Sequence, residues 1–344
     1  MSGSLPSLPE WKTLFQVAIE FKKIECWNWM SDTDLIGVQN PENGLIGYCC
    51  IMGGLKEMLG LVVYLGTEGL AGYRKIQSED HDLDAPHFLY LQKCLTVTFE
   101  GRKYLREPDL KIIKGLGLKF RGPQDWPLFR NYQPGYLPWY LNREEVLYLT
   151  PLIPQVMEGA LRIKEKTDLL TPPRKNCYLV RIPEKVGETL TWKEEWLEPS
   201  PAEKREPDAP PVDELHLQRI KKQISRRQGV WEIDQFYSPS VVDEGGRPYF
   251  PYVFLWVDQD TGLVLNVRVA GSSNYQADFQ DQFIGLLEKL KFFPNEIWSR
   301  NEEPFKLSEP IASALGIKLI RVKRLPALEK VKKHLFSFFE TGKP

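Results

Sequence analysis

The chain has 344 residues, of which 42% are hydrophobic and 26% are charged, and its formal net charge at pH 7 is −1. Single hydrophobic cores stop growing near this length, so about two domains are expected. The near-neutral charge argues against a dedicated nucleic-acid or membrane binder. Five cysteines without a CxxC pair argue against a secreted disulfide framework. With neither a signal-peptide pattern nor a membrane-spanning apolar run, we expect a cytoplasmic protein that contacts no membrane.

The first predicted element is a helix over residues 7–24. Ser7 and Glu10 have the spacing of a capping box, and apolar residues then recur at helical spacing. Two β-rich runs flank "NPENG" at residues 40–44, which is a hairpin signal. Further strands and short helices follow to residue 117. Together with two later strands, these elements predict an α+β domain over residues 1–198.

Residues 120–142 are rich in proline and aromatics and are expected to form an ordered, irregular segment. The next run, 143–166, is amphipathic, and we expect Pro151 and Pro154 to break or kink its helix. Aromatic side chains in loops can line a groove for a peptide or another ligand. They can equally anchor an extended segment to its own core, which we favour. The binding candidates are Trp27, Trp29, Trp126, Tyr136 and Trp139.

A proline-rich stretch separates the two halves of the chain. Five of the thirteen residues from 199 to 211 are proline, and none of the others has an apolar side chain larger than alanine. Nothing in this stretch can enter a core, so we interpret residues 199–212 as an interdomain linker.

The second half, residues 213–344, begins with a helix, after which three strands, a helix, a strand, a helix, a strand and a helix are predicted. Such an order makes a mixed sheet with flanking helices, an α/β domain. It resembles the ribonuclease-H-like superfold, which includes integrases and transposases. The resemblance implies an aspartate in the first core strand that helps to hold two metal ions. Asp258 lies close to such a position, although at a strand end.

The expected partners of Asp258 depart from that pattern. The strand after the long helix is followed by Arg300 and Asn301, where a second carboxylate is required. If the domain is a metal-dependent nuclease, its candidate ligands are Asp258, Asp260, Glu302 and Glu309. The alternative, which we favour, is that Asp258 and Asp260 only form a turn whose positive-φ position is Gly262.

Other chemical motifs are weak. His81 and His87 flank Asp82 and Asp84, but an acidic solvated loop explains them better than a zinc site. No P-loop, GxSxG or HExxH motif is present. Cys49 and Cys50 lie in an apolar strand and are interpreted as inert buried thiols. We therefore expect no metal and no cofactor.

Several stretches together resemble a family of uncharacterised bacterial proteins. They include residues 27–70, "WPLFRNYQPGYLPWYLN" and "YVFLWVDQDTGLVL". Both modules of that family are domains of unknown function. The resemblance implies a bacterial, cytoplasmic, two-domain protein and supplies no catalytic residues.

The sequence leads to two functional hypotheses. The first is a non-catalytic cytoplasmic binding or scaffold protein, with a protein or peptide as its partner. The alternative is a divergent ribonuclease-H-like, metal-dependent nuclease or nucleic-acid-binding protein.

Overall fold

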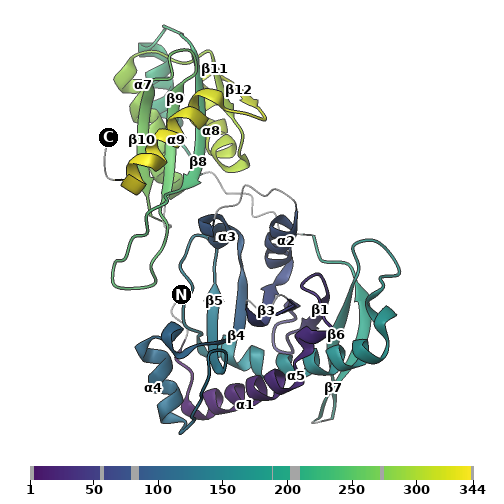
Figure 1. The fold of residues 1–344 in the computed structure, drawn as a ribbon. Coiled ribbons are helices and arrows are strands. Elements are labelled where there is room, and N and C mark those ends of the chain that lie inside the picture. The colour runs from purple at the N-terminus through teal and green to yellow at the C-terminus, as the bar shows by residue number, and fades with distance from the viewer. Residues whose placement is uncertain are drawn as a thin grey trace. The chain divides into compact units, whose positions relative to one another are not determined.

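The computed structural model describes residues 4–54, 58–78, 85–187, 189–201, 210–271 and 275–341. The chain divides into two compact units, Met1–Ala202 and Glu203–Pro344 (Figure 1). Residues 202–209 of the predicted linker lie outside the described residues, as do His81, Asp82 and Asp84 of the predicted acidic loop. That the linker joins two domains able to fold separately stays a prediction.

Over the described residues, the first unit holds a seven-stranded mixed sheet of order β5-β4-β3-β2-β1-β6-β7. Strands β1 to β5 form an antiparallel meander, β6 runs parallel to β1, and β6 and β7 form an antiparallel ribbon. The hairpin predicted at "NPENG" is confirmed by the pairing of β1 with β2. The helices and strands of this unit are α1 (Leu8–Ile24), β1 (Leu35–Gln39), β2 (Ile46–Met52), β3 (Leu59–Leu65), α2 (Gly66–Gln77), α3 (Ala85–Leu91), β4 (Cys94–Glu100), α4 (Glu107–Gly115), β5 (Trp126–Tyr132), α5 (Arg143–Glu165), β6 (Tyr178–Val186) and β7 (Thr189–Leu197).

Helices α1 and α5 lie side by side over one face of this sheet (Figure 1). The predicted capping box is confirmed, because the Ser7 backbone N–H donates to Glu10 at 2.7 Å and the Glu10 N–H donates to Ser7 Oγ at 3.4 Å. One side of α1, including Leu14, Ala18 and Phe21, is fully buried against α5 and the sheet. Helix α2 packs on the other face. The sheet is therefore covered on both faces.

Two predictions for this unit are wrong. The expected break at Pro151 and Pro154 does not occur, because the buried face of α5, with Leu149, Leu152 and Val156, packs into the core along the whole helix. The segment expected to be irregular contains β5, whose seven residues pair with β4. Strand β5 is an edge strand, and a proline is tolerated there because one side of its backbone needs no ladder hydrogen bond.

The second unit holds a five-stranded mixed sheet of order β10-β9-β8-β11-β12 in the described residues. Strands β8, β9 and β10 are antiparallel, whereas β11 runs parallel to both β8 and β12. This confirms the predicted order of elements. They are α6 (Glu214–Gln223), β8 (Val230–Tyr237), β9 (Tyr252–Asp258), β10 (Val264–Ala270), α7 (Tyr275–Leu290), β11 (Glu296–Ser299), α8 (Glu302–Leu315), β12 (Lys318–Arg321) and α9 (Pro326–Thr341).

Strand β8 is central and presents different residues to the two faces of its sheet, since side chains alternate along a strand. Trp231 and Ile233 point into the core made with α6, α7 and α8. The alternate residues, Glu232 and Asp234, lie on the face that α9 covers. Two carboxylates are thus buried beneath one helix. In the described part of the chain, no helix is long and apolar enough to cross a membrane.

Candidate functional site

The candidate site lies on the α9 face of the second sheet, toward the carboxyl ends of its parallel strands. Strands β8, β11 and β12 run in the same direction, so the residues that end them meet at one edge. In open α/β sheets this edge is where ligands bind. Asp234 lies within β8, and Arg300 and Asn301 directly follow β11. Helix α9 adds Glu329 and Lys332 to the same region.

Asp234 is the centre of this cluster and is only 1% exposed. Its Oδ1 accepts a hydrogen bond of 2.6 Å from the Asn301 amide nitrogen. Its Oδ2 accepts one of 3.2 Å from Arg300 Nη2. The other terminal nitrogen of Arg300 lies 3.3 Å from a Glu329 carboxylate oxygen. The guanidinium of Arg300 therefore bridges a carboxylate on β8 and a carboxylate on α9.

Burial sets the electrostatics of the cluster. It raises the pKa of the Asp234 carboxyl, and the charge of Arg300 opposes that rise. Burial also lowers the pKa of the Lys332 ammonium, which the charge of Asp234 opposes. Lys332 Nζ lies 4.3 Å from the ring centroid of Phe236, so its charge is partly held by an aromatic face. Two cations thus accompany one buried aspartate.

Glu232 connects the same strand to the start of α9. Its side chain is fully buried, and one carboxylate oxygen accepts the Leu328 backbone N–H at 2.7 Å. The other oxygen, Oε1, has no hydrogen-bond partner among the described residues. Burial raises the pKa of Glu232, and the backbone N–H groups of Leu328 and Ala327 oppose the rise. Glu232 therefore holds the first turn of α9 against β8.

This arrangement does not suit a divalent metal ion. The described residues contain no group of three or more His, Cys, Asp or Glu side chains placed to hold one. Asp234 and Glu329 are the two carboxylates that Arg300 joins, and a guanidinium repels a metal ion. A two-metal site needs several converging carboxylates around ions that lie about 3.5–4 Å apart. Here a side-chain cation takes the place between the carboxylates.

The four acidic residues predicted for the nuclease hypothesis are not brought together. Asp258 ends β9, the second strand of the meander, and pairs with Trp231 near the start of β8. Its Oδ1 accepts hydrogen bonds from the Thr261 N–H at 2.9 Å and the Thr261 hydroxyl at 2.7 Å. Asp260 is exposed in the same turn, where Gly262 has a φ of 70°. That Asp258 has no catalytic role stays a prediction, and these contacts fit a turn.

Glu302 and Glu309 lie on α8 instead. The helix begins at Glu302, and Glu309 lies two turns further along it. Glu302 is exposed and pairs with Lys306 at 3.2 Å, one turn further along the helix. Glu309 is also exposed. The first core strand is β8, and its carboxylates are Glu232 and Asp234.

Sequence reasoning did not single out Glu232, Asp234 or Glu329. A usable signal exists in "VWEIDQFY", where two carboxylates stand at alternate positions of a run predicted to be a strand. Alternate positions share a face, so the two acids had to lie side by side. Arg300 and Asn301 were identified at the end of the strand that follows the long helix, and that strand is β11.

The aromatic binding candidates pack within the first unit. The ring of Trp27 is buried 6.1 Å from that of Phe99. The indole N–H of Trp29 donates to the Ala160 carbonyl at 2.9 Å, and Lys164 Nζ lies 4.4 Å from its ring. Both tryptophans also line an open hollow of about 700 Å³. These contacts serve the core, and a role in binding stays a prediction.

The remaining aromatic candidates lie around β5. The ring of Trp126 packs 5.7 Å from that of Phe120. Trp139 packs 5.3 Å from Tyr140 and exchanges backbone hydrogen bonds with Asn131 of β5. The Tyr136 backbone N–H closes a turn onto the Gln133 carbonyl at 3.0 Å. The three residues are thus spread along the segment that contains and follows β5.

The thiols of Cys49 and Cys50 lie in surroundings that disfavour reactivity. All five cysteines are buried and unpaired. Burial raises the pKa of Cys50 to about 12, and it raises the pKa of Cys49 as well. The nucleophilic thiolate is therefore disfavoured at neutral pH.

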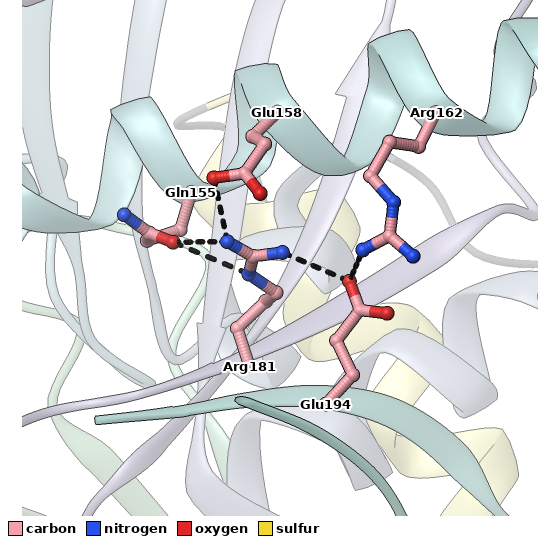
Figure 2. A network of polar contacts seen from close by, with 5 residues as sticks. All are labelled: Gln155, Glu158, Arg162, Arg181 and Glu194. Atoms are coloured by element: carbon pink, nitrogen blue, oxygen red, sulfur yellow. Dashed lines mark hydrogen bonds and ion pairs between the residues drawn. The ribbon is translucent and has the colours of Figure 1, made fainter. Parts of the chain in front are cut away.

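A second polar cluster, in the first unit, is centred on Arg181 of β6 (Figure 2). Its guanidinium donates to the Gln155 side-chain oxygen at 2.7 Å, to Glu158 at 2.6 Å and to Glu194 at 2.9 Å. Arg162 also pairs with Glu194 (Figure 2). All three nitrogens of the Arg181 guanidinium donate hydrogen bonds within the cluster, which therefore joins α5 to the β6–β7 ribbon.

Comparison with known proteins adds two matches to sequence families. Residues 11–181 match a family described as a domain of unknown function, DUF7309, and residues 216–336 match another, DUF6930. A search of curated proteins found no match. Among solved structures, a chain in the crystal structure of a pre-cleavage Mos1 transpososome is 12% identical, with 78% of each chain covered and a TM-score of 0.18. A TM-score this low supports no argument about fold or function, and the bacterial origin implied by the sequence stays a prediction. Two family models, both described as domains of unknown function, thus cover residues 11–181 and 216–336 of the chain.

Proposed function

We propose that the protein binds a partner without cleaving it, and that its second unit is a ribonuclease-H-like domain. In this domain, side-chain cations occupy the place where that superfold would bind metal ions. The observation that carries this proposal is the guanidinium of Arg300, which stands between Asp234 and Glu329. A domain with this arrangement keeps the scaffold and lacks the means to hold two metal ions.

The sheet of the second unit supports the fold part of the proposal. Numbered within the unit, its strands run in the order 3-2-1-4-5, with the first three antiparallel and the last two parallel to the first. Helix α7 connects the third strand to the fourth, and α8 connects the fourth to the fifth. This is the order of elements by which the sequence resembles the ribonuclease-H-like superfold.

The positions of the charged residues support the functional part. The superfold implies one carboxylate in the first strand, one after the fourth strand and one on a later helix. Asp234 and Glu329 fit the first and third positions, whereas Arg300 and Asn301 follow the fourth strand. Both of these residues donate hydrogen bonds to Asp234. The buried aspartate is therefore neutralised from within the protein and needs no metal ion.

Thermal melting with and without Mg²⁺ or Mn²⁺ tests this proposal, together with a nuclease assay on single- and double-stranded substrates. The variants are Asp234→Asn, in the cluster, and Asp258→Asn, in the turn, as the matched control. We expect no metal-dependent change in midpoint and no cleavage for any of the three proteins. A bound ion would stabilise the fold by roughly 2.7 kcal/mol at a hundredfold excess over its Kd. Stabilisation of wild type that Asp234→Asn abolishes, accompanied by cleavage, would overturn the proposal.

A specific observation favours nucleic acid as a second candidate partner. Three exposed cations lie beside the carboxyl end of β11: Arg321, which ends β12, and Lys323 and Arg324, which follow it. Arg321 approaches Glu302 no closer than 4.0 Å, so its charge is weakly paired. Exposed cations at a strand edge can contact phosphates without reading sequence.

Gel-shift measurements on single- and double-stranded DNA and RNA at low and moderate salt test this candidate. Lys323→Glu with Arg324→Glu should weaken binding at least tenfold if the edge contacts phosphates, and the affinity should fall steeply with salt. Lys289→Glu with Lys291→Glu, which changes two exposed cations at the end of α7, is the matched control. Equal loss in both double variants, or no binding by wild type, would exclude the edge as a nucleic-acid site.

A further inference from the structure

A hollow in the first unit combines an aromatic floor with a cationic rim. Its volume is about 510 Å³, within the range of roughly 300–1,000 Å³ typical of small-molecule sites. It lies between the second half of α1, the end of β4 and the loop that precedes β5. None of its lining residues takes part in the cluster around Arg300, which belongs to the second unit.

The floor of the hollow is apolar and partly flat. Phe99, the penultimate residue of β4, is 1% exposed and contributes its ring from the core. Phe120 is half-buried and packs on Phe15 and on Trp126, with ring centroids 6.3 Å and 5.7 Å away. Because these neighbours fix the Phe120 ring, the floor is in place before any ligand arrives. A planar ring in the hollow would find aromatic and aliphatic surface beneath it.

The rim carries more positive than negative charge. Lys22, Lys23, Lys119 and Arg121 line the hollow, against Glu25 and Asp125. Lys22 pairs with Asp125, and its ammonium lies 5.6 Å from the centroid of the Phe99 ring. The other three cations form no ion pair with any described residue. Three unpaired cations around one hollow suit a ligand with more than one negative charge.

Glycines shape the loop that carries Lys119 and Arg121. Gly117 has a φ of 68° and Gly122 a φ of 109°, a backbone region that favours glycine. A Cβ at Gly122 would stand 2.6 Å from an Asp125 carboxylate oxygen, so glycine leaves room for the Asp125 side chain, which pairs with Lys22. The two glycines therefore let the backbone turn before Lys119 and after Arg121. The cations of this loop stay beside the hollow.

We propose that this hollow binds a small aromatic phosphate, with the planar ring over the half-buried Phe120 and the phosphate dianion at Lys119 and Arg121. A phosphate fits the rim better than a carboxylate, because a dianion engages more than one of the unpaired cations and accepts the paired N–H donors of arginine. The aromatic part is required by the floor. Inorganic phosphate alone leaves the apolar surface in water.

The test is isothermal titration of the full chain with AMP, phenyl phosphate, inorganic phosphate and benzoate, with tryptophan fluorescence as a second readout. Trp126 packs against Phe120, so binding over that ring should change its emission. We expect AMP or phenyl phosphate to bind at least tenfold more tightly than inorganic phosphate or benzoate. If inorganic phosphate binds as tightly as phenyl phosphate, the apolar floor does not contribute to binding and the proposed aromatic ligand is wrong. If neither AMP nor phenyl phosphate binds at millimolar concentration, the proposal is overturned.

Charge-reversal variants locate the site. Lys119→Glu with Arg121→Glu changes two exposed side chains and should weaken binding of the aromatic phosphate at least tenfold while leaving the melting midpoint unchanged. Lys12→Glu with Lys114→Glu makes the same change in net charge at exposed positions of α1 and α4 outside the hollow. An equal loss of affinity in both double variants, or an unchanged affinity in the first, would assign the binding to another place.

Discussion

Arg181 in the first unit and Arg300 in the second each join two carboxylates, but burial is distributed between the partners in opposite ways. The side chain of Arg181 is 5% exposed, whereas its partner Glu158 is 54% exposed. The side chain of Arg300 is 39% exposed, whereas its partner Asp234 is 1% exposed. In the first cluster the cation is the buried charge, and in the second the anion is.

The difference decides what each arginine does for its unit. Removing a partner from a buried ion pair is strongly destabilising because it leaves a buried charge uncompensated. Without Arg181, Glu158 can be hydrated and Glu194 keeps Arg162. Without Arg300, Asp234 keeps only neutral hydrogen-bond partners next to a lysine. Position in the sheet adds a second difference, because Arg181 lies within β6 while Arg300 follows the end of a strand, where ligands usually bind.

The largest effect is expected for Arg300→Met, which should lower the free energy of unfolding of the second unit by about 3 kcal/mol. The reason is the buried Asp234 that is left behind. Urea denaturation measures the cost. An Asp234→Asn background has no buried carboxylate that could be left unpaired. In that background the same substitution should lower the free energy of unfolding by less than about 1 kcal/mol. An equal cost in the two backgrounds would show that Arg300 acts through packing and would weaken the proposed neutralisation of Asp234.

Arg181→Met should have the next largest effect, about 2 kcal/mol on the first unit. The methionine fills much of the same space but makes none of the hydrogen bonds to Gln155, Glu158 and Glu194. Arg162→Met is the control, because Arg162 pairs with the same Glu194 but is 44% exposed. Its cost should lie below about 1 kcal/mol, as for other exposed pairs. If the two variants cost the same, burial is not what distinguishes them.

The sequence predicted much of this framework because the signals were local. The capping box of Ser7 and Glu10, the hairpin at "NPENG" and the strand that contains Asp234 depend on neighbours within a few residues. The pairing of β5 and the continuity of α5 depend on a sheet edge and a core built from distant segments. For that reason Pro127 and Pro154 were misleading, since each proline alone argues against the element that contains it.

The candidate site was only partly predictable for the same reason. Arg300 and Asn301 were placed correctly after a strand, and the departure from a metal site was visible in their chemistry. Asp258 drew attention because it follows an apolar run, while Glu232 and Asp234 were passed over inside one. Their burial is made by α9, which begins about ninety residues later in the chain. No local pattern reveals that Arg300 will stand between Asp234 and Glu329.

Glu232 extends the comparison to a buried carboxylate that pairs with no arginine among the described residues. Its raised pKa means that the folded state binds its proton more tightly than the unfolded state does. In the window between the two pKa values, the stability of the second unit therefore falls as pH rises. Glu232→Gln keeps an acceptor for the Leu328 N–H without the charge. The variant should be more stable than wild type at neutral pH, and the gap should close below about pH 4, where the carboxyl is protonated in both states.

Chemical denaturation across pH 4 to 8 measures this difference. Glu309→Gln, at an exposed position of α8, is the control and should change stability by less than about 0.5 kcal/mol throughout. A Glu232→Gln variant that is less stable than wild type at neutral pH would mean that the charge at the start of α9 stabilises the helix more than burial opposes it.

Separating the two units should change the stability of each unit least of all. The separation tests whether each arginine cluster stabilises only the unit that contains it. The composition of residues 199–212 predicts that limited proteolysis cuts there first and releases two folded fragments. Each fragment should then keep the melting midpoint it has in the intact chain, because neither arginine cluster draws a residue from the other unit. The cost of Arg300→Met should be the same in the released C-terminal fragment as in the full chain, and Arg181→Met should leave that fragment unaffected. First cleavage at another loop, or unfolding of either fragment on release, would show that the units depend on each other and that the two clusters cannot be compared as independent sites.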